Sequence, residues 1–74
     1  MGFDECLNIF CKKHGYTGHL GYNSSTLEYE IILSKGDNNA GAFLSEEELQ
    51  SMNNQQFHDL LELLHKGFQA KFNQ

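Results

Sequence analysis

Two cysteines and two histidines lie within fourteen residues near the N-terminus, CLNIFCKKHGYTGH, from Cys6 to His19. Thiolates and imidazoles are the usual ligands of structural zinc, which takes four of them, most often as a CxxC pair and a second pair on a turn or helix. Here the order is C-x4-C-x2-H-x4-H. Five positions on a helix correspond to about 500° of rotation, so Cys6 and Cys11 point about 140° apart. Because one helix cannot direct both thiols at one ion, we predict no metal and no cofactor for Cys6, Cys11, His14 and His19.

The same stretch is better explained as one face of a helix. Apolar or soft side chains recur there at spacings of three and four: Phe3, Cys6, Leu7, Phe10, Cys11 and His14. We therefore expect a helix from Phe3 to His14 that ends at Gly15, a residue favoured just after helices. Cys6 is expected to pack in the apolar stripe as a small hydrophobic side chain, with Cys11 at its flank. A disulfide is not expected, because such a pair lies near or beyond the Cα separation limit of about 7 Å.

The middle of the chain predicts a small sheet. In residues 27–34 four apolar side chains alternate with mostly polar ones: Leu27, Tyr29, Ile31 and Leu33 alternate with Glu28, Glu30, Ile32 and Ser34. This pattern is typical of a half-buried strand with one solvated face. Turn-forming clusters occupy residues 23–26 and 35–41, so strands at about 18–22 and 42–44 are expected to flank it. The turns are too short for parallel crossovers, which predicts a three-stranded antiparallel sheet.

Two capping signals introduce the C-terminal helices. In SEEEL, Ser45 and Glu48 have the spacing of a capping box, which predicts a short helix over residues 46–52. In NNQQF, Asn53 and Gln56 repeat the pattern before an amphipathic helix whose apolar face is Phe57, Leu60, Leu61, Leu64 and Phe68. Gly67 is expected to end that helix. The order α-β-β-β-α-α predicts one α+β domain over residues 1–74, with the helices on one face of the sheet.

Catalytic patterns are absent from the sequence. His58 and His65 lie seven residues apart beside Asp59 and Glu62, and a histidine with a carboxylate neighbour can act as a general base. We interpret them instead as the solvated flank of an amphipathic helix. No GxSxG, phosphate-binding loop or HExxH motif is present, and a chain of this length encloses little of a cleft. We therefore expect no enzymatic activity.

Charge indicates the kind of partner. Ten acidic residues stand against five lysines and no arginine, a formal net charge of −5. Direct nucleic-acid binding is not expected, because it requires Lys and Arg at the phosphates. A protein with a basic surface is the more compatible partner. The candidate partner-binding residues are Glu28, Glu30, Asp37, Glu46, Glu47 and Glu48. For Glu46–Glu48 the alternative is stabilisation of the helix N-terminus.

The N-terminal residues MGFDECLNIF contain no basic segment followed by a long apolar one, and no stretch reaches 18 apolar residues. We therefore expect neither export nor membrane insertion. A cytoplasmic location and reduced thiols are expected instead.

Two resemblances follow from these elements. The α-β-β-β-α order resembles the double-stranded-RNA-binding domain, but that domain begins its last helix with lysines, where this chain has SEEEL and NNQQF. Residues 27–68, LEYEIILSKGDNNAGAFLSEEELQSMNNQQFHDLLELLHKGF, look like the small proteins of bacteriophages and prophages. Several anti-CRISPR inhibitors are similar in size, acidity and sheet-plus-helix build, and they occupy the nucleic-acid-binding surface of a nuclease. This resemblance implies a phage-encoded inhibitor in a bacterial host cell, and no functional residue is carried over from it.

The sequence thus predicts a small acidic, non-enzymatic interaction protein, of phage or mobile-element origin, that binds and inhibits or modulates a larger protein. That larger protein would have a basic surface, as proteins that handle nucleic acid do. The alternative is a self-associating structural or regulatory module. In that version Phe68, Phe72 and one side of the leucine-rich C-terminal helix are buried in a homodimer, since a chain this small gains stability from oligomerisation.

Overall fold

The computed structural model describes residues 2–72 and confirms the predicted α+β order. Its elements are α1 (Phe3–His14), β1 (Thr17–Asn23), β2 (Glu28–Lys35), β3 (Asn38–Ser45), α2 (Glu46–Ser51) and α3 (Asn54–Phe72). The strands form an antiparallel sheet with β2 between β1 and β3. The first helix has the bounds that its apolar stripe predicts, and Gly15 ends it in the left-handed conformation, with φ 76°.

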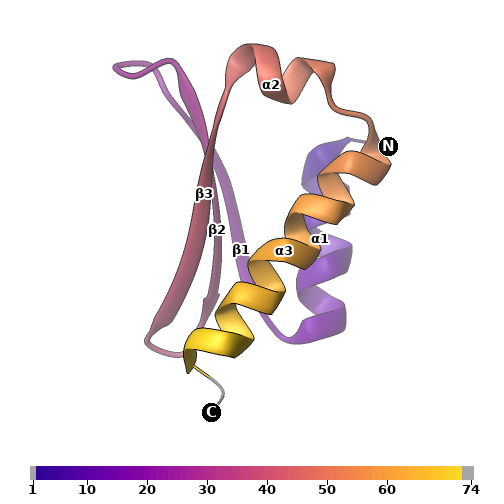
Figure 1. Cartoon of the computed structure of the whole chain (residues 1–74), viewed down its shortest axis with the longest axis vertical. Coiled ribbons are helices and arrows are strands. Elements are labelled where there is room, and N and C mark those ends of the chain that lie inside the picture. Colours follow the sequence, from indigo (N-terminus) through magenta and orange to yellow (C-terminus); the bar gives the residue numbers. More distant parts are fainter. Residues whose placement is uncertain (1, 73–74) are drawn as a thin grey trace.

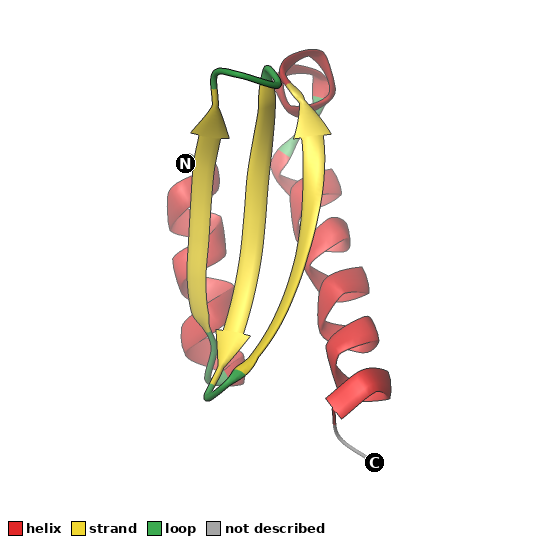
Figure 2. Cartoon of the chain, turned by 90° about the vertical axis from the view of Figure 1, so that its left-hand side faces the viewer, coloured by secondary structure: helices red, strands yellow, loops and turns green. Residues whose placement is uncertain are grey.

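The helices cover one face of the sheet, as expected, and leave the other open (Figures 1 and 2). α1 packs on β1 and α3 on β3. The two helices run in the same direction: Phe3 near the start of α1 stacks on Phe57 near the start of α3, with ring centroids 4.5 Å apart. At the other end of α1, His14 packs on His65 of α3. The structure therefore has two layers, the sheet and the helices, and the helices pack on one face of the sheet.

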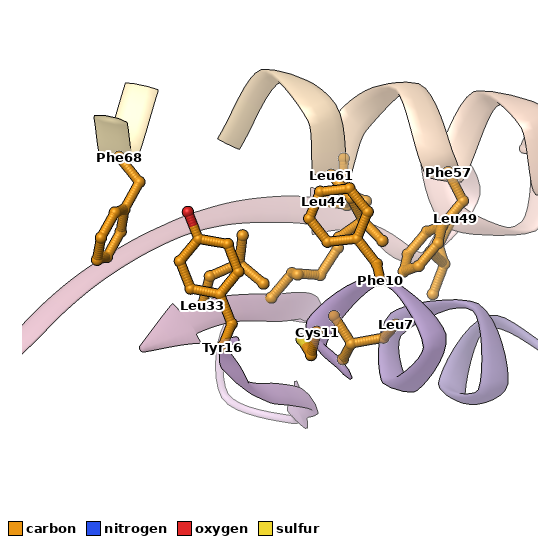
Figure 3. Packing of buried hydrophobic residues seen from close by; sticks show 11 residues of the cluster. Leu7, Phe10, Cys11, Tyr16, Leu33, Leu44, Leu49, Phe57, Leu61 and Phe68 are labelled. Carbon is orange, nitrogen blue, oxygen red and sulfur yellow. The ribbon is translucent and has the colours of Figure 1, made fainter. Parts of the chain in front are cut away.

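The core lies between those layers. Its most buried side chains are Ile31, Leu33, Phe57 and Leu61, and it extends from Leu49 and Phe57 at one end to Tyr16 and Phe68 at the other (Figure 3). Tyr29, Ile31 and Leu33 face this core, as their alternation predicts. Leu27 does not, which corrects the expectation for residues 27–34: it ends the turn before β2 with φ 58° and is exposed. The chain needs a left-handed residue there to reverse direction, so β2 begins one residue later.

The hairpin between β2 and β3 is tighter than the sequence suggests. Residues 35–41 are rich in turn formers, yet Lys35 pairs directly with Asn38, which leaves only Gly36 and Asp37 in the loop. Gly36 supplies the positive φ, 62°, that two-residue hairpin loops require. β3 consequently spans Asn38–Ser45 rather than 42–44. Ser34 Oγ donates a 2.6 Å hydrogen bond to Asn39 Oδ1 across the ladder, so pairing with β2 outweighs the weak local strand preference of these residues.

Both predicted capping boxes are confirmed. The Ser45 side chain accepts from the Glu48 amide and the Glu48 side chain accepts from the Ser45 amide, each at 3.1 Å. Asn53 and Gln56 make the equivalent pair at 2.7 and 2.9 Å.

The expected helix end at Gly67 is wrong, because α3 continues to Phe72. Phe68 is only 5% exposed and packs edge-on against Tyr16, and Phe72 packs on Phe68. Burial of these rings outweighs the cost of a helical glycine, about 1 kcal/mol.

The cysteines exchange the roles that the sequence suggests. Cys11 is the buried one and Cys6 is only partly buried; both are free thiols. The reason is the close approach of α1 to β1 at Gly18, where a Cβ atom would lie 2.6 Å from Cys11 Sγ and 3.0 Å from Leu7 Cγ. The Cys11 side chain therefore fills the space that Gly18 leaves. Burial raises the pKa of the Cys11 thiol, which keeps it protonated as a small apolar group.

Candidate functional site

The open face of the sheet carries an exposed aromatic ring among carboxylates. Residues that pair directly across an antiparallel ladder point to the same face, and Glu30 pairs with Phe43 of β3. Because Ile31 and Leu33 point into the core, Glu28, Glu30 and Phe43 point away from it. Phe43 is 63% exposed. A single exposed apolar side chain is common on protein surfaces, so it is the combination of Phe43 with the carboxylates of Glu28 and Glu30 on one solvated face that makes this face a candidate contact surface.

The sheet register brings these carboxylates toward the short helix. Glu28 pairs with Ser45, the N-cap residue of α2, so the first turn of α2 begins at the strand end beside Glu28. Five of the six predicted partner-binding residues are thus gathered at one end of the sheet. We call this the acidic sheet surface, and its members are Glu28, Glu30, Phe43, Glu46, Glu47 and Glu48.

Asp37, the sixth predicted residue, lies apart. It occupies the hairpin loop at the other end of β2. At about 3.3 Å per residue, the length of β2 places it about 25 Å from Glu28. The structure therefore does not bring Asp37 together with the acidic sheet surface.

The carboxylates of this surface differ in what they already bind. Glu48 is engaged in the capping box, and Glu46 accepts from the side-chain amide of Gln50 at 3.4 Å. Glu48 thus has the helix-stabilising role that the sequence offered as an alternative. Within residues 2–72, the carboxylates of Glu28 and Glu30 form no hydrogen bond or ion pair, although both residues are only partly exposed. Together with exposed Glu47, which also has no hydrogen bond or ion pair within residues 2–72, these two are the carboxylates left available for a partner.

Sequence reasoning missed Phe43 and the segregation of charge. Residues 42–44 were expected to form a strand, but no face was assigned to them; the signal was the alternation of Phe43 with buried Leu44. All five lysines lie toward the opposite end, where α1, β2 and α3 terminate: Lys12, Lys13, Lys35, Lys66 and Lys71. Asp4 and Glu5 of α1 lie at the end where α3 also begins. The lysines are therefore gathered at one end of the molecule, and the carboxylates other than Asp37, Asp59 and Glu62 lie toward the other end.

A histidine and tyrosine cluster lies at the lysine-rich end. The Tyr16 hydroxyl is 2.6 Å from His65 Nδ1, and the His65 ring centroid is 4.2 Å from that of His14. His65 was expected on a solvated helix flank, but it is partly buried in this cluster. Among the described residues, buried His14 Nε2 has no hydrogen-bond partner.

The protonation states in this cluster follow from burial. Desolvation is the main cause that lowers the pKa of His65, with contributions from nearby His14 and Lys35 and a partial opposition from Glu62. Desolvation also raises the pKa of Tyr16, with a smaller contribution from Cys11. A neutral imidazole and a protonated phenol result, so Tyr16 donates and His65 Nδ1 accepts.

Stability should therefore depend on pH below neutrality. The His65 pKa is lowered in the folded state, whereas an unfolded histidine titrates at about 6.5. As pH falls through that value the unfolded chain takes up a proton that the folded chain does not, so the free energy of unfolding should decrease between about pH 7 and pH 5. The free energy of unfolding, measured with urea over this pH range, should depend less on pH for His65→Gln than for wild type. The exposed His19→Gln should retain the wild-type dependence, and equal slopes for all three proteins would contradict this assignment.

The cysteine and histidine stretch does not converge. His14 packs toward α3, whereas His19 pairs with Ile32 on the open face of the sheet. A Cβ on Gly21 would lie 2.7 Å from His19 Nε2, so that ring lies along the open face. Over residues 2–72, no group of three or more His, Cys, Asp or Glu side chains is arranged to hold a metal ion.

Comparison of the chain with family models, with curated proteins and with solved structures found no match. None of the helices described within residues 2–72 is long and apolar enough to cross a membrane.

Proposed function

We propose that this chain is a non-enzymatic interaction protein that binds a larger protein through the acidic sheet surface and thereby inhibits or modulates it. One observation carries the proposal: the open face of the sheet holds Phe43, 63% exposed, directly beside unpaired Glu30 and near unpaired Glu28. The partner this chemistry fits has basic side chains around an apolar or aromatic contact.

The physical basis is complementarity of both charge and shape. Carboxylates opposite Lys or Arg accelerate encounter and fix the orientation of a complex. Aromatic side chains are enriched among the residues that contribute most to binding. Since all five lysines lie toward the other end of the molecule, no lysine side chain competes with a basic partner at this surface.

The partner class follows from the same charges. Proteins that handle nucleic acid present Lys and Arg clusters to phosphates, and an acidic protein surface can occupy such a cluster. We propose a partner of this class, and with it an origin in a phage or another mobile element acting in a bacterial cytoplasm.

Charge reversal should separate this surface from the rest of the molecule. Wild type, Glu28→Lys/Glu30→Lys and a control, Asp37→Lys/Asp59→Lys, would each be used to capture proteins from bacterial lysate at low salt. The control changes net charge by the same amount at exposed positions away from the acidic sheet surface. A protein captured by wild type and control should bind the Glu28/Glu30 variant at least about tenfold more weakly in direct titration.

The salt dependence of that binding provides the second criterion. Affinity of wild type should fall as ionic strength rises, because screening shortens the range of charge attraction. Equal affinities of the two double variants would remove the acidic-surface mechanism.

A captured protein should also lose nucleic-acid binding in the presence of this chain. Undiminished binding of nucleic acid by the captured protein would refute inhibition by occupancy.

Self-association is the second candidate, and the structure limits which residues of the C-terminal helix could carry it. Phe68 is 5% exposed and belongs to the core of the monomer, so it is not available for the interface that the sequence suggested. Leu63 of α3 is 66% exposed, and Ile9 of α1 is also exposed. Sedimentation over a range of concentrations tests this version: Leu63→Ala should dissociate a dimer, whereas a monomer at every concentration argues against it.

A further inference from the structure

A small hollow opens at the lysine-rich end, far from the acidic sheet surface. Its volume is about 230 Å³. The end of β2, the start of β3 and the last turns of α3 form its walls, and Tyr16 and Phe68, which lie close together in Figure 3, form its inner part. The lining residues are Tyr16, Lys35, Asn38, His65, Phe68, Gln69 and Phe72.

The polar lining consists of groups that can donate hydrogen bonds. Lys35 contributes an ammonium group whose Nζ lies 4.6 Å from the centre of the Tyr16 ring. Asn38 and Gln69 contribute side-chain amides, and among residues 2–72 no carboxylate is part of the lining. Within residues 2–72, Lys35 is in no ion pair. An ammonium beside two amides matches the oxygen atoms of a carboxylate or phosphate group.

The remaining lining is aromatic. Tyr16, Phe68 and Phe72 contact one another in series, with ring centroids 5.0 and 4.9 Å apart. Small-ligand sites commonly combine apolar and aromatic walls with a few placed polar groups. The volume is smaller than the range of about 300–1,000 Å³ found for drug-sized ligands, which limits the occupant to about one ring.

We propose that this hollow binds a small organic anion with a single flat ring, the anionic group on Lys35 and Asn38 and the ring against Phe68 and Phe72. This inference does not depend on the proposed function, because the two surfaces lie at opposite ends of the sheet. The end of α3 carries partial negative charge from its free carbonyl groups. Lys71 in its last turn, with Nζ 5.2 Å from the centre of the Phe72 ring, opposes that charge beside the hollow.

Binding should be linked to the protonation of His65, which lines the hollow. His65 faces the imidazole of His14, the ammonium of Lys35, the carboxylate of Glu62 and the phenol of Tyr16. An anion placed beside Lys35 adds negative charge near the imidazole and favours its protonated form. Because burial holds the His65 pKa below the ordinary value of about 6.5, affinity should by linkage rise as pH falls below about 6.5.

Titration of the ¹⁵N-labelled chain with benzoate and with phenyl phosphate tests the proposal, with neutral benzyl alcohol as the matched probe. We expect dissociation constants of about a millimolar for the two anions, typical of one-ring ligands. Amide shifts should be confined to Tyr16 and to residues 35–38 and 65–72, which line or flank the hollow. Benzyl alcohol should bind at least about tenfold more weakly, a comparison that uses wild-type protein alone.

Variants then locate the anionic group. Lys35→Met keeps an apolar side chain over Tyr16 and should weaken the affinity for benzoate at least about tenfold. Lys12→Met, at the same end on α1, should leave the affinity for benzoate unchanged. Shifts spread over all five lysines, or equal losses in the two variants, would show diffuse charge attraction and overturn the proposal. Equal affinities of the wild-type protein for benzoate and benzyl alcohol would also overturn the proposal.

Discussion

Replacement of Leu61 by Ala should lower the free energy of unfolding by about 2–5 kcal/mol. Leu61 lies in the middle of α3, is 0% exposed and packs between the helices and the sheet (Figure 3). Its removal leaves a cavity that the surrounding core side chains fill only partly. A 74-residue domain has a total stability of about 4–11 kcal/mol, so the variant should be unfolded, or nearly so, at moderate urea concentration.

Leu63→Ala is the matched control. It makes the same change in the same helix, two residues away, at a side chain that is 66% exposed. The expected change is within about 0.5 kcal/mol. Urea unfolding followed by circular dichroism measures both variants. Similar losses at the two positions would contradict the placement of α3 on the sheet.

Gly18→Ala should destabilise the protein by about 1–3 kcal/mol through overpacking. A Cβ at this position would lie 2.6 Å from Cys11 Sγ, closer than atoms tolerate, because α1 lies directly on β1 there. Cys11→Ala removes that sulfur atom. The double variant should therefore be more stable than the sum of the two single changes implies, by about 0.5 kcal/mol or more.

Gly67→Ala provides the contrast within the same chain. Nothing lies within 4 Å of a Cβ at this helical position, so the substitution should raise stability by up to about 1 kcal/mol. Additive effects of Gly18→Ala and Cys11→Ala in urea unfolding would mean that the two residues do not share the contact described here.

The elements that the sequence predicts well are those governed by local chemistry. Both capping boxes use side chains that bond within three residues of themselves, and α1 begins and ends where its apolar stripe and Gly15 indicate. The differences arise where contacts between distant segments decide. Gly67 does not end α3, because Phe68 packs against Tyr16, about fifty residues away in the chain.

The tight hairpin has the same explanation. Asn38, Asn39 and Gly41 favour turns, yet the register with β2 holds them in a strand. Cys11 rather than Cys6 is buried because of Gly18, a residue on another element. Helical periodicity identified the stripe but not the point at which the sheet would approach it.

The candidate surface was only partly predictable. The alternation in residues 27–34 placed Glu28 and Glu30 on a solvated face, and the structure agrees. The register then adds Phe43, which no spacing along the chain relates to Glu30, and separates Asp37 by the length of β2. The hollow beside Lys35 joins three segments distant in sequence, namely Tyr16, the hairpin at residues 35–38 and the end of α3, and no local pattern indicates it.

Hydrogen exchange, measured on the chain alone and in complex with a protein that wild type captures, tests most directly whether the acidic sheet surface is the binding surface. We predict slower exchange confined to the amides of residues 28–30 and 43–48, on β2, β3 and α2. The same amides should show no protection when the Glu28→Lys/Glu30→Lys variant is used at equal concentrations. Protection of α1 and α3 around Ile9 and Leu63 instead, with the sheet unchanged, would contradict this function and place the interface on the helical layer.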